Sequence, residues 1–131
     1  MPIRTKRWND DAAPEDGFRL LVCRIRPRGV ARADETWDAW WPELGPSRGL
    51  LDAFHGKGGD TSLSWADYVP CYLVEMEGLG QLWRIRDLAR RLAQGETITL
   101  LCSTACTDPE RCHRTLLAGL LAPGEAPRRR S

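Results

Sequence analysis

Two continuous apolar runs constrain the fold more than any other feature of this sequence. Residues 18–23 (FRLLVC) are apolar except for Arg19, and residues 97–102 (TITLLC) are interrupted only by threonine. Short uninterrupted runs of this kind are typical of strands that are buried on both faces of a parallel sheet. The sequence therefore predicts two central strands, and residues 2–8 (PIRTKRW) predict a short opening strand before them.

The region between the two runs carries helical patterns. Ser47 precedes apolar residues at helical spacing, and Ser64 is a suitable N-cap for a second helix over residues 64–78, in which Pro70 should produce a kink. Residues 79–94 repeat the pattern, with apolar side chains on one face and arginines elsewhere. Three helices are expected here.

A tryptophan-rich segment lies before these helices. Trp37, Trp40 and Trp41 are spaced three and four residues apart, which predicts one face of a short helix ending before Pro42. An irregular segment is the alternative interpretation. These aromatic side chains are expected in the core, with a homodimer interface as the alternative.

The order of the elements predicts the fold class. A strand, several helices, a strand and a final helix indicate an α/β domain with a small, mostly parallel sheet and helices packed on it. A chain of 131 residues falls in the size range of one domain, which we place at residues 1–122. Residues 123–131 (PGEAPRRRS) form a basic tail that is expected to be disordered.

The net charge favours no broad class of partner, so nucleic acid or an anionic membrane would need a local basic patch. Nineteen basic residues against eighteen acidic ones create no global field toward nucleic acid or an anionic membrane. No apolar run approaches the roughly 20 residues that span a bilayer, and the first residues lack the apolar core of a secretory signal. We expect a cytoplasmic protein without a membrane partner. Five cysteines, an odd number, then favour free thiols or a metal site over a disulfide framework.

The second strand leads into the most unusual segment of the chain, residues 100–121 (LLCSTACTDPERCHRTLLAGLL). Cys102 should lie at the carboxyl end of the strand, where open α/β sheets bind their ligands. Asp108 and Pro109 predict the start of a helix that carries His113 and Arg114 in its first turns. A helix start at this edge suits a phosphate or carboxylate ligand.

The cysteines of this segment have three interpretations. A zinc site would use Cys102, Cys106, Cys112 and His113, although the spacing is not the paired C-x2-C pattern. Adjacent residues on a helix also point about 100° apart, which argues against joint ligation by Cys112 and His113. A catalytic cysteine is the second interpretation. Buried packing of the thiols as small apolar groups is the third.

A second basic group follows the first strand. Arg24, Arg26 and Arg28 alternate in CRIRPRG, so they would share one side of an extended chain. If the two central strands are parallel neighbours, these arginines reach the edge that carries the helix start and form a basic pocket there. The alternative is a solvated arginine stripe paired with acids such as Asp34 and Glu35.

His55 is the other histidine of the chain. It is expected at the C-terminus of a helix, where the helix dipole favours it. The glycine-rich residues after it suggest a lid over a site as an alternative.

The motifs described above resemble the DUF488 family of small bacterial proteins, in its YeaO-type branch. The similarity covers residues 3–121 and is most specific at PRG (27–29) and at the stretch D-P-E-x-C-H-R (108–114). It implies a compact α/β fold and no established reaction. The positions that match the family's motifs are Arg24, Pro27, Arg28, Gly29, Asp108, Pro109, Cys112, His113 and Arg114.

The chain departs from the family's pattern at three positions and in the loop that carries Cys106, which is longer than usual. Cys23 and Arg26 stand where the family usually has aspartate and tryptophan, and Pro70 stands where an ordinary helical residue is expected. A mechanism that needs a carboxylate at position 23 is therefore not transferable to this chain.

We predict that the carboxyl edge of the sheet binds a small anionic ligand, with phosphate- or nucleotide-bearing species as the leading class. The predicted ligand-binding residues are Arg24, Arg28, Cys102, Asp108 and Arg114. His113 is predicted as a donor or general acid-base group, and Cys112 or Cys102 as a wall or the nucleophile. No metal or cofactor is part of this prediction.

Two alternatives belong to other functional classes. A non-enzymatic module for nucleic acid or a protein partner would use the arginine stripe, the basic tail and exposed tryptophans. A metal-binding domain would hold zinc with the segment from Cys102 to His113.

Overall fold

The computed structural model describes residues 3–56, 63–103 and 108–121. These residues form a four-stranded, all-parallel sheet with the strand order β1-β4-β2-β3. The strands are β1 (Ile3–Arg7), β2 (Phe18–Leu21), β3 (Ala39–Trp40) and β4 (Ile98–Cys102). Cys106 and the basic tail lie outside the described residues. The predicted α/β class and parallel sheet are confirmed.

The two apolar runs form the centre of the sheet, as their composition predicted. Leu20 of β2 pairs in register with Leu100 of β4, and all five residues of β4 are buried. Strand β2 is shorter than the apolar run and ends at Leu21, although the Val22 amide still donates to the Leu101 carbonyl. Both central strands end at the same edge of the sheet because they are parallel.

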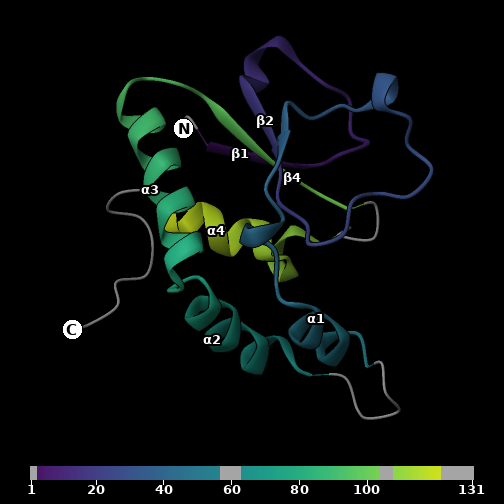
Figure 1. Ribbon diagram of the computed structural model, residues 1–131, viewed down its shortest axis with the longest axis vertical. Coiled ribbons are helices and arrows are strands. Elements are labelled where there is room, and N and C mark those ends of the chain that lie inside the picture. The colour runs from purple at the N-terminus through teal and green to yellow at the C-terminus, as the bar shows by residue number, and fades with distance from the viewer. Residues whose placement is uncertain (1–2, 57–62, 104–107, 122–131) are drawn as a thin grey trace.

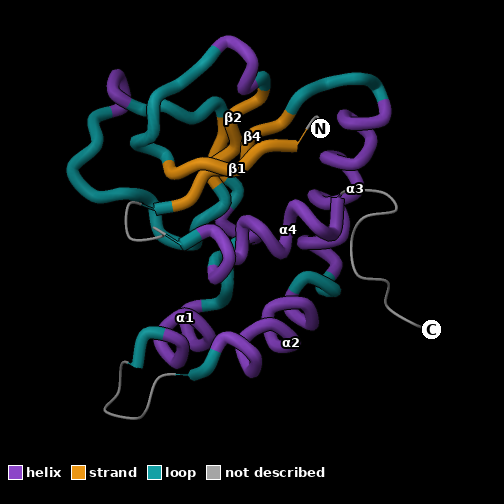
Figure 2. The backbone as a smooth tube through the Cα atoms, turned by 180° about the vertical axis from the view of Figure 1, so that it is seen from behind, coloured by secondary structure: helices purple, strands orange, loops and turns teal. Residues whose placement is uncertain are grey.

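Four α-helices lie on one side of the sheet (Figure 1). They are α1 (Arg48–Phe54), α2 (Trp65–Glu75), α3 (Leu79–Ala93) and α4 (His113–Leu121). In Figures 1 and 2, α4 crosses beneath the strands, and α1 and α2 lie farther from the sheet beyond it. The side chains of Ser47 and Ser64 cap α1 and α2, which confirms the N-cap predicted at Ser64 and the helix start predicted at Ser47. Pro70 lies inside α2, which continues to Glu75.

The tryptophan segment is not a helix, so that prediction was wrong. Residues 39–40 form β3, which pairs with β2, and residues 42–44 form a single 3-10 turn. The three indoles point into different environments: Trp37 packs edge-on against Trp8, Trp40 donates to the Cys23 carbonyl, and Trp41 packs against Phe18. Strand pairing at the edge of the sheet overrides the helical spacing.

The predicted start of the last helix also differs from the structure. The Asp108 carboxylate accepts a hydrogen bond from the Glu110 amide, but it caps a 3-10 turn over residues 109–111. Cys112 follows in an extended conformation (φ −134°, ψ 140°), and α4 begins only at His113. Pro109 therefore opens a short turn before the helix, and Cys112 is not helical.

The sheet separates two apolar clusters. On the helical side, Leu20, Leu100 and Ile98 pack against helix residues such as Tyr72 and Leu117. On the other side, the strands pack against loops through a second cluster of buried residues: Leu21, Cys23, Trp37, Leu101, Cys102 and Cys112. None of the described helices is long and apolar enough to span a membrane.

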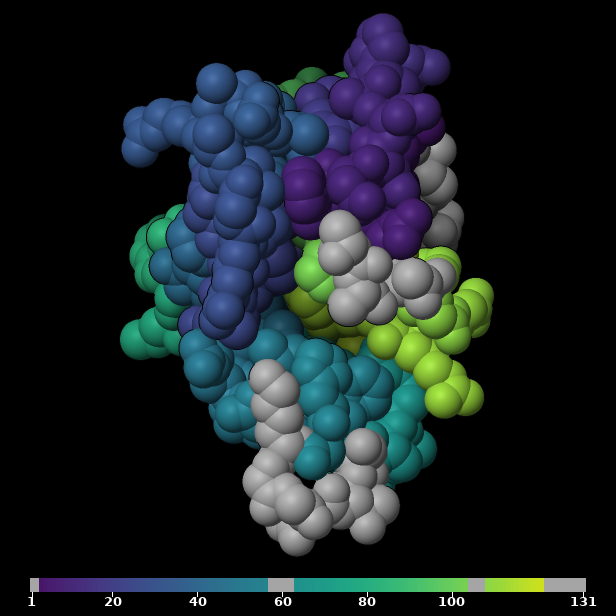
Figure 3. Space-filling view, turned by 90° about the vertical axis from the view of Figure 1, so that its right-hand side faces the viewer, coloured from purple at the N-terminus to yellow at the C-terminus, as the bar shows by residue number. Residues whose placement is uncertain are grey.

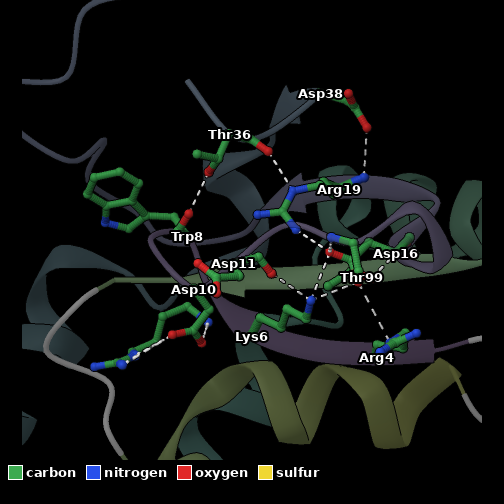
Figure 4. Close-up of polar contacts among 12 residues, drawn as sticks. Arg4, Lys6, Trp8, Asp10, Asp11, Asp16, Arg19, Thr36, Asp38 and Thr99 are labelled. Carbon is green, nitrogen blue, oxygen red and sulfur yellow. Dashed lines mark hydrogen bonds and ion pairs between the residues drawn. The ribbon is translucent and has the colours of Figure 1, made fainter. Parts of the chain in front are cut away.

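A buried carboxylate lies at the opposite end of the sheet from the predicted site. Asp16 lies in the segment that connects β1 to β2, is fully buried, and forms ion pairs with Lys6 and Arg19 (Figure 4). Its side chain also accepts the Ala13 amide, and its backbone carbonyl accepts the Thr99 hydroxyl at 2.7 Å. Three strands and the loop before β2 are thus tied together by one residue.

Candidate functional site at the carboxyl edge of the sheet

A pocket of about 440 Å³ opens where β2 and β4 end. Its walls come from the loop after β2, the end of β4, the start of α4 and the helices α1 and α2. Figure 3 looks onto the side of the molecule where these segments meet. Its polar lining includes Arg24, Cys102, Asp108, Arg111, Cys112 and His113.

Arg24 is held at the rim of the pocket by two backbone carbonyls. Its Nε donates to the Pro46 carbonyl at 2.9 Å, and its Nη2 donates to the Gly45 carbonyl at 3.1 Å. The backbones approach closely here, since a Cβ at Gly45 would lie 2.5 Å from the Arg24 nitrogen. Glycine at position 45 therefore allows the contact that orients the guanidinium.

Two thiols and an imidazole form the buried end of the pocket. Cys102 is the last residue of β4, Cys112 is the extended residue before α4, and His113 is the first residue of α4. All three are buried, and their donor atoms lie within 4.8 Å of one another. We call these three side chains the Cys-Cys-His cluster.

The orientation of the His113 ring is set by a backbone group. Nε2 lies 2.8 Å from the carbonyl oxygen of Val22, in the residue that directly follows β2. A carbonyl only accepts hydrogen bonds, so Nε2 carries a proton and donates it to this carbonyl. The ring of Tyr72 packs on the imidazole with 5.6 Å between centroids, and its hydroxyl donates to the Leu44 carbonyl at 2.8 Å.

The opposite wall of the pocket is apolar. Leu51 and Phe54 of α1 and Tyr68 of α2 line it, and the rings of Phe54 and Tyr68 lie 4.6 Å apart. His55 follows them as the C-cap of α1, where the sequence predicted a helix-terminal histidine, and it also lines the pocket. The pocket therefore combines a polar end with an aromatic wall, which is typical of small-molecule sites.

The structure brings five of the seven predicted site residues to this pocket and places the other two elsewhere. Arg28 is exposed in a turn with Gly29 (φ 75°) and does not line the pocket. Arg114 is buried and does not line it either. The Arg7 amide is the largest cause that lowers the pKa of Asp10, and the charge of Arg114 adds to it.

The alternating arginines do not form a stripe on one side, which corrects that expectation. The chain bends at residues 24 and 25 instead of continuing as a strand. Arg26 pairs with Glu35 and lies over the Trp37 ring, 5.3 Å from its centroid, away from the pocket. Pairing with a nearby acid, the alternative interpretation, therefore describes Arg26.

Sequence reasoning missed Arg111 as a pocket residue. It occupies the variable position of the D-P-E-x-C-H-R stretch. Its position inside a motif already assigned to the site could have identified it. Cys23 and Ser103 also line the pocket. Each directly adjoins a predicted site residue in the sequence. That Cys23 lines the pocket depends on the bend after β2, which the sequence did not reveal.

The extended conformation of Cys112 removes an objection to metal binding. The argument that Cys112 and His113 diverge by about 100° holds only when both are helical. Here the cluster joins Cys102, Cys112 and His113 around one point. The arrangement can serve either a thiolate beside an imidazole or a metal ion.

Comparisons with known proteins agree with the resemblance drawn from the motifs. The family described as "Active DUF488-N3 subclade" matches residues 3–124. The uncharacterized protein YeaO of Escherichia coli (strain K12) is 36% identical over 124 residues, covering 92% of this chain and 97% of YeaO. The uncharacterized protein Rv3073c of Mycobacterium tuberculosis (strain ATCC 25618 / H37Rv) is 29% identical, covering 91% of this chain and 92% of its own length. No solved structure matches the chain. The chain therefore belongs to the DUF488 family, and specifically to this YeaO-like subclade.

Proposed function

We propose that this protein binds a small anionic ligand, with phosphate- or nucleotide-bearing molecules as the leading class, in the pocket at the carboxyl edge of the sheet. The observation that carries the proposal is the charge of the lining. Arg24 and Arg111 face a pocket of about 440 Å³ in which Asp108 is the one carboxylate among the described lining residues.

The two arginines have hydrogen-bonding capacity left for a ligand. Nη1 of Arg24 has no acceptor among the residues that the structure describes, while Nε and Nη2 fix the guanidinium in place. Arg111 is exposed and forms no ion pair with a described residue. Planar guanidinium groups bind phosphate and carboxylate through paired N–H donors. An oriented arginine and an exposed one at the rim favour an anion over a cation.

The aromatic wall extends the proposal from a bare anion to a nucleotide. Leu51, Phe54 and Tyr68 give the pocket an apolar surface, in which the rings of Phe54 and Tyr68 are packed together. A ligand with a phosphate and a flat base would place the phosphate at the arginines and the base at the rings. The predicted catalytic roles of His113 and Cys112 stay predictions, since ligand binding does not depend on them.

Calorimetric titration of the protein with pyrophosphate and with AMP tests the proposal. We expect Arg24→Gln and Arg111→Gln each to weaken binding by about tenfold or more, because each removes a charge-assisted hydrogen bond. Arg86→Gln is the matched control, since Arg86 is an exposed arginine on α3, outside the pocket. Equal affinities for all four proteins would contradict the proposal.

The nucleic-acid alternative has one observation in its favour. Trp83 on α3 is 70% exposed and could stack on a base, with Arg86 as an exposed neighbour on the same helix. Binding of a single-stranded oligonucleotide that falls steeply with salt and survives Arg24→Gln would support this alternative over the pocket.

A further inference from the structure

We infer that Cys102, Cys112 and His113 form a binding site for a divalent transition metal, with zinc as the best match, whose open coordination position faces the pocket. The three side chains come from the end of β4, from the residue before α4 and from the first residue of α4. All three line the pocket. The proposed metal site uses only these three side chains and does not depend on the binding of an anion in the pocket.

The distances suit a metal ion after a small contraction. The three donor atoms lie within 4.8 Å of one another. Donor atoms in a tetrahedral zinc site with Cys and His ligands are about 3.5–3.8 Å apart, as follows from the usual Zn–S and Zn–N bond lengths. Movements of about 1 Å or less would therefore close the site around an ion.

The chemistry of the donors also matches zinc. Two thiolates and one imidazole are a ligand set of catalytic zinc sites, in which water or substrate takes the fourth position. A ligating histidine usually donates its other ring N–H to a carbonyl or carboxylate, which fixes its tautomer. The Nε2 contact to the Val22 carbonyl matches this arrangement, in which Nδ1 would be the ligand atom.

Simple packing explains this cluster less well. Buried thiols alone could fill core space, as Cys23 does nearby while its thiol donates to the Ile25 carbonyl at 3.2 Å. The Cys-Cys-His cluster instead brings three potential ligands from separate elements to one point at the wall of a pocket. Packing does not require that convergence.

A bound metal ion would also strengthen the binding of a phosphate-bearing ligand in the pocket. This step rests on the proposed function. A zinc ion at the cluster would present its open position to the same space as Arg24 and Arg111. An anionic oxygen of a phosphate could then bind the ion while the arginines bind the remaining oxygens. Zinc-loaded protein should accordingly bind pyrophosphate more tightly than metal-free protein.

Titration with Zn²⁺ and with Co²⁺ tests the metal site without any anion. Each thiol loses its proton on binding, so titration in weak buffer should release protons as zinc is added. Co²⁺ should give thiolate-to-cobalt charge-transfer absorption and the visible bands of a tetrahedral ion. We expect Cys102→Ala, Cys112→Ala and His113→Gln each to weaken zinc binding by about 100-fold or more, since outer-shell partners alone contribute 10–100-fold.

Cys71→Ser is the matched control, because Cys71 is an exposed free cysteine on α2 and does not line the pocket. It should bind zinc like the unmodified chain. His113→Gln keeps a donor for the Val22 carbonyl, and circular dichroism of the metal-free variants checks that each one folds. Cobalt spectra that lack charge transfer, or affinities that the three cluster variants leave unchanged, would overturn the metal site. A disulfide between Cys102 and Cys112 in freshly purified protein would overturn it as well.

Pyrophosphate titrations of the metal-free and the zinc-loaded protein separate the two proposals. If zinc binds at the cluster and pyrophosphate binds neither form, the metal site stands and the proposed function fails. If pyrophosphate binds through Arg24 and Arg111 but zinc does not bind, the proposed function stands and the metal site is wrong. If zinc and pyrophosphate both bind but zinc leaves the affinity for pyrophosphate unchanged, the inference that a phosphate oxygen binds the metal ion is wrong.

Discussion

Replacing Asp16 with asparagine is expected to lower the free energy of unfolding by about 3–5 kcal/mol, which is the usual effect of breaking a buried ion pair. Asp16 is fully buried, and Arg19, which pairs with it, is 7% exposed. Asparagine keeps the shape but leaves the guanidinium in a buried position without its counter-charge. Lys6 loses the same partner, with its Nζ 2.9 Å from the Asp16 carboxylate in the native chain (Figure 4).

Chemical denaturation measures this effect, and Asp87→Asn is the matched control. Asp87 also pairs with two arginines, Arg90 and Arg91, but its side chain is 31% exposed on the surface of α3. Exposed ion pairs of this kind contribute about 0–1 kcal/mol. Equal losses in the two variants would show that burial does not set the contribution of Asp16.

The same carboxylate should make stability depend on acid. Burial alone would raise the pKa of Asp16, but hydrogen bonds from Lys6 and the Ala13 amide, together with the charge of Lys6, lower it below the ordinary 3.8. A lowered pKa in the folded state stabilises the fold above pH 3.8, and this stabilisation is lost as the pH falls through the folded-state value. The gap in stability between the native chain and Asp16→Asn should therefore shrink on acidification. A constant gap down to pH 2 would contradict this assignment.

Replacing Tyr72 with alanine should cost a similar amount, about 3–5 kcal/mol, as is usual for removing a buried aromatic ring. Tyr72 is fully buried and stacks on Tyr68, with 6.1 Å between ring centroids. It also packs on His113, so the variant should loosen the cluster at the end of the pocket. A loss below about 1 kcal/mol in urea unfolding would contradict this account of the core.

Tyr72→Phe separates the ring from the hydroxyl. It keeps the stacking but leaves the Leu44 carbonyl without its donor, which should cost roughly 1–3 kcal/mol. Burial, and after it the nearby Tyr68 and Cys112, raises the pKa of Tyr72 well above its ordinary 10.0. The resulting stabilisation is complete below pH 10 and is lost as the pH rises further. Tyr72→Phe should reduce this alkaline loss, and an unchanged alkaline profile would contradict the assignment.

The fold could be predicted from the sequence wherever a local pattern was compatible with only one type of secondary structure. The apolar runs 18–23 and 97–102 became paired central strands because only burial on both faces fits such runs. Ser47 and Ser64 became caps because their hydroxyls satisfy amides that a helix start leaves without partners.

The tryptophan segment shows where local patterns fail. Spacings of three and four residues suited a helix, but Ala39 and Trp40 complete the edge of the sheet beside β2. Pairing with a distant strand supplies backbone hydrogen bonds that spacing within the segment cannot reveal. The start of α4 failed for a related reason, since an N-cap and a proline open a 3-10 turn as readily as an α-helix.

The location of the candidate site could be predicted from the sequence, but the set of residues that line it could be predicted only in part. Parallel strand ends and the D-P-E-x-C-H-R stretch located it, and Arg24, Cys102 and His113 line the pocket. The positions of Arg28 and Arg114 depend on the bend after β2 and on the rotation of α4, which neither motif determines. The three side chains of the Cys-Cys-His cluster come together because Cys112 is extended. The sequence pattern placed Cys112 in a helix and therefore did not predict this arrangement.

An NMR titration of ¹⁵N-labelled protein with pyrophosphate tests the central claim most directly, because it locates the bound anion. The account predicts that the largest amide shifts fall on residues around the pocket, including Arg24, Arg111 and His113, and that a sodium chloride titration at matched ionic strength does not reproduce them. Shifts concentrated on α3 around Trp83, or none beyond the salt control, would contradict an anion site at the carboxyl edge of the sheet.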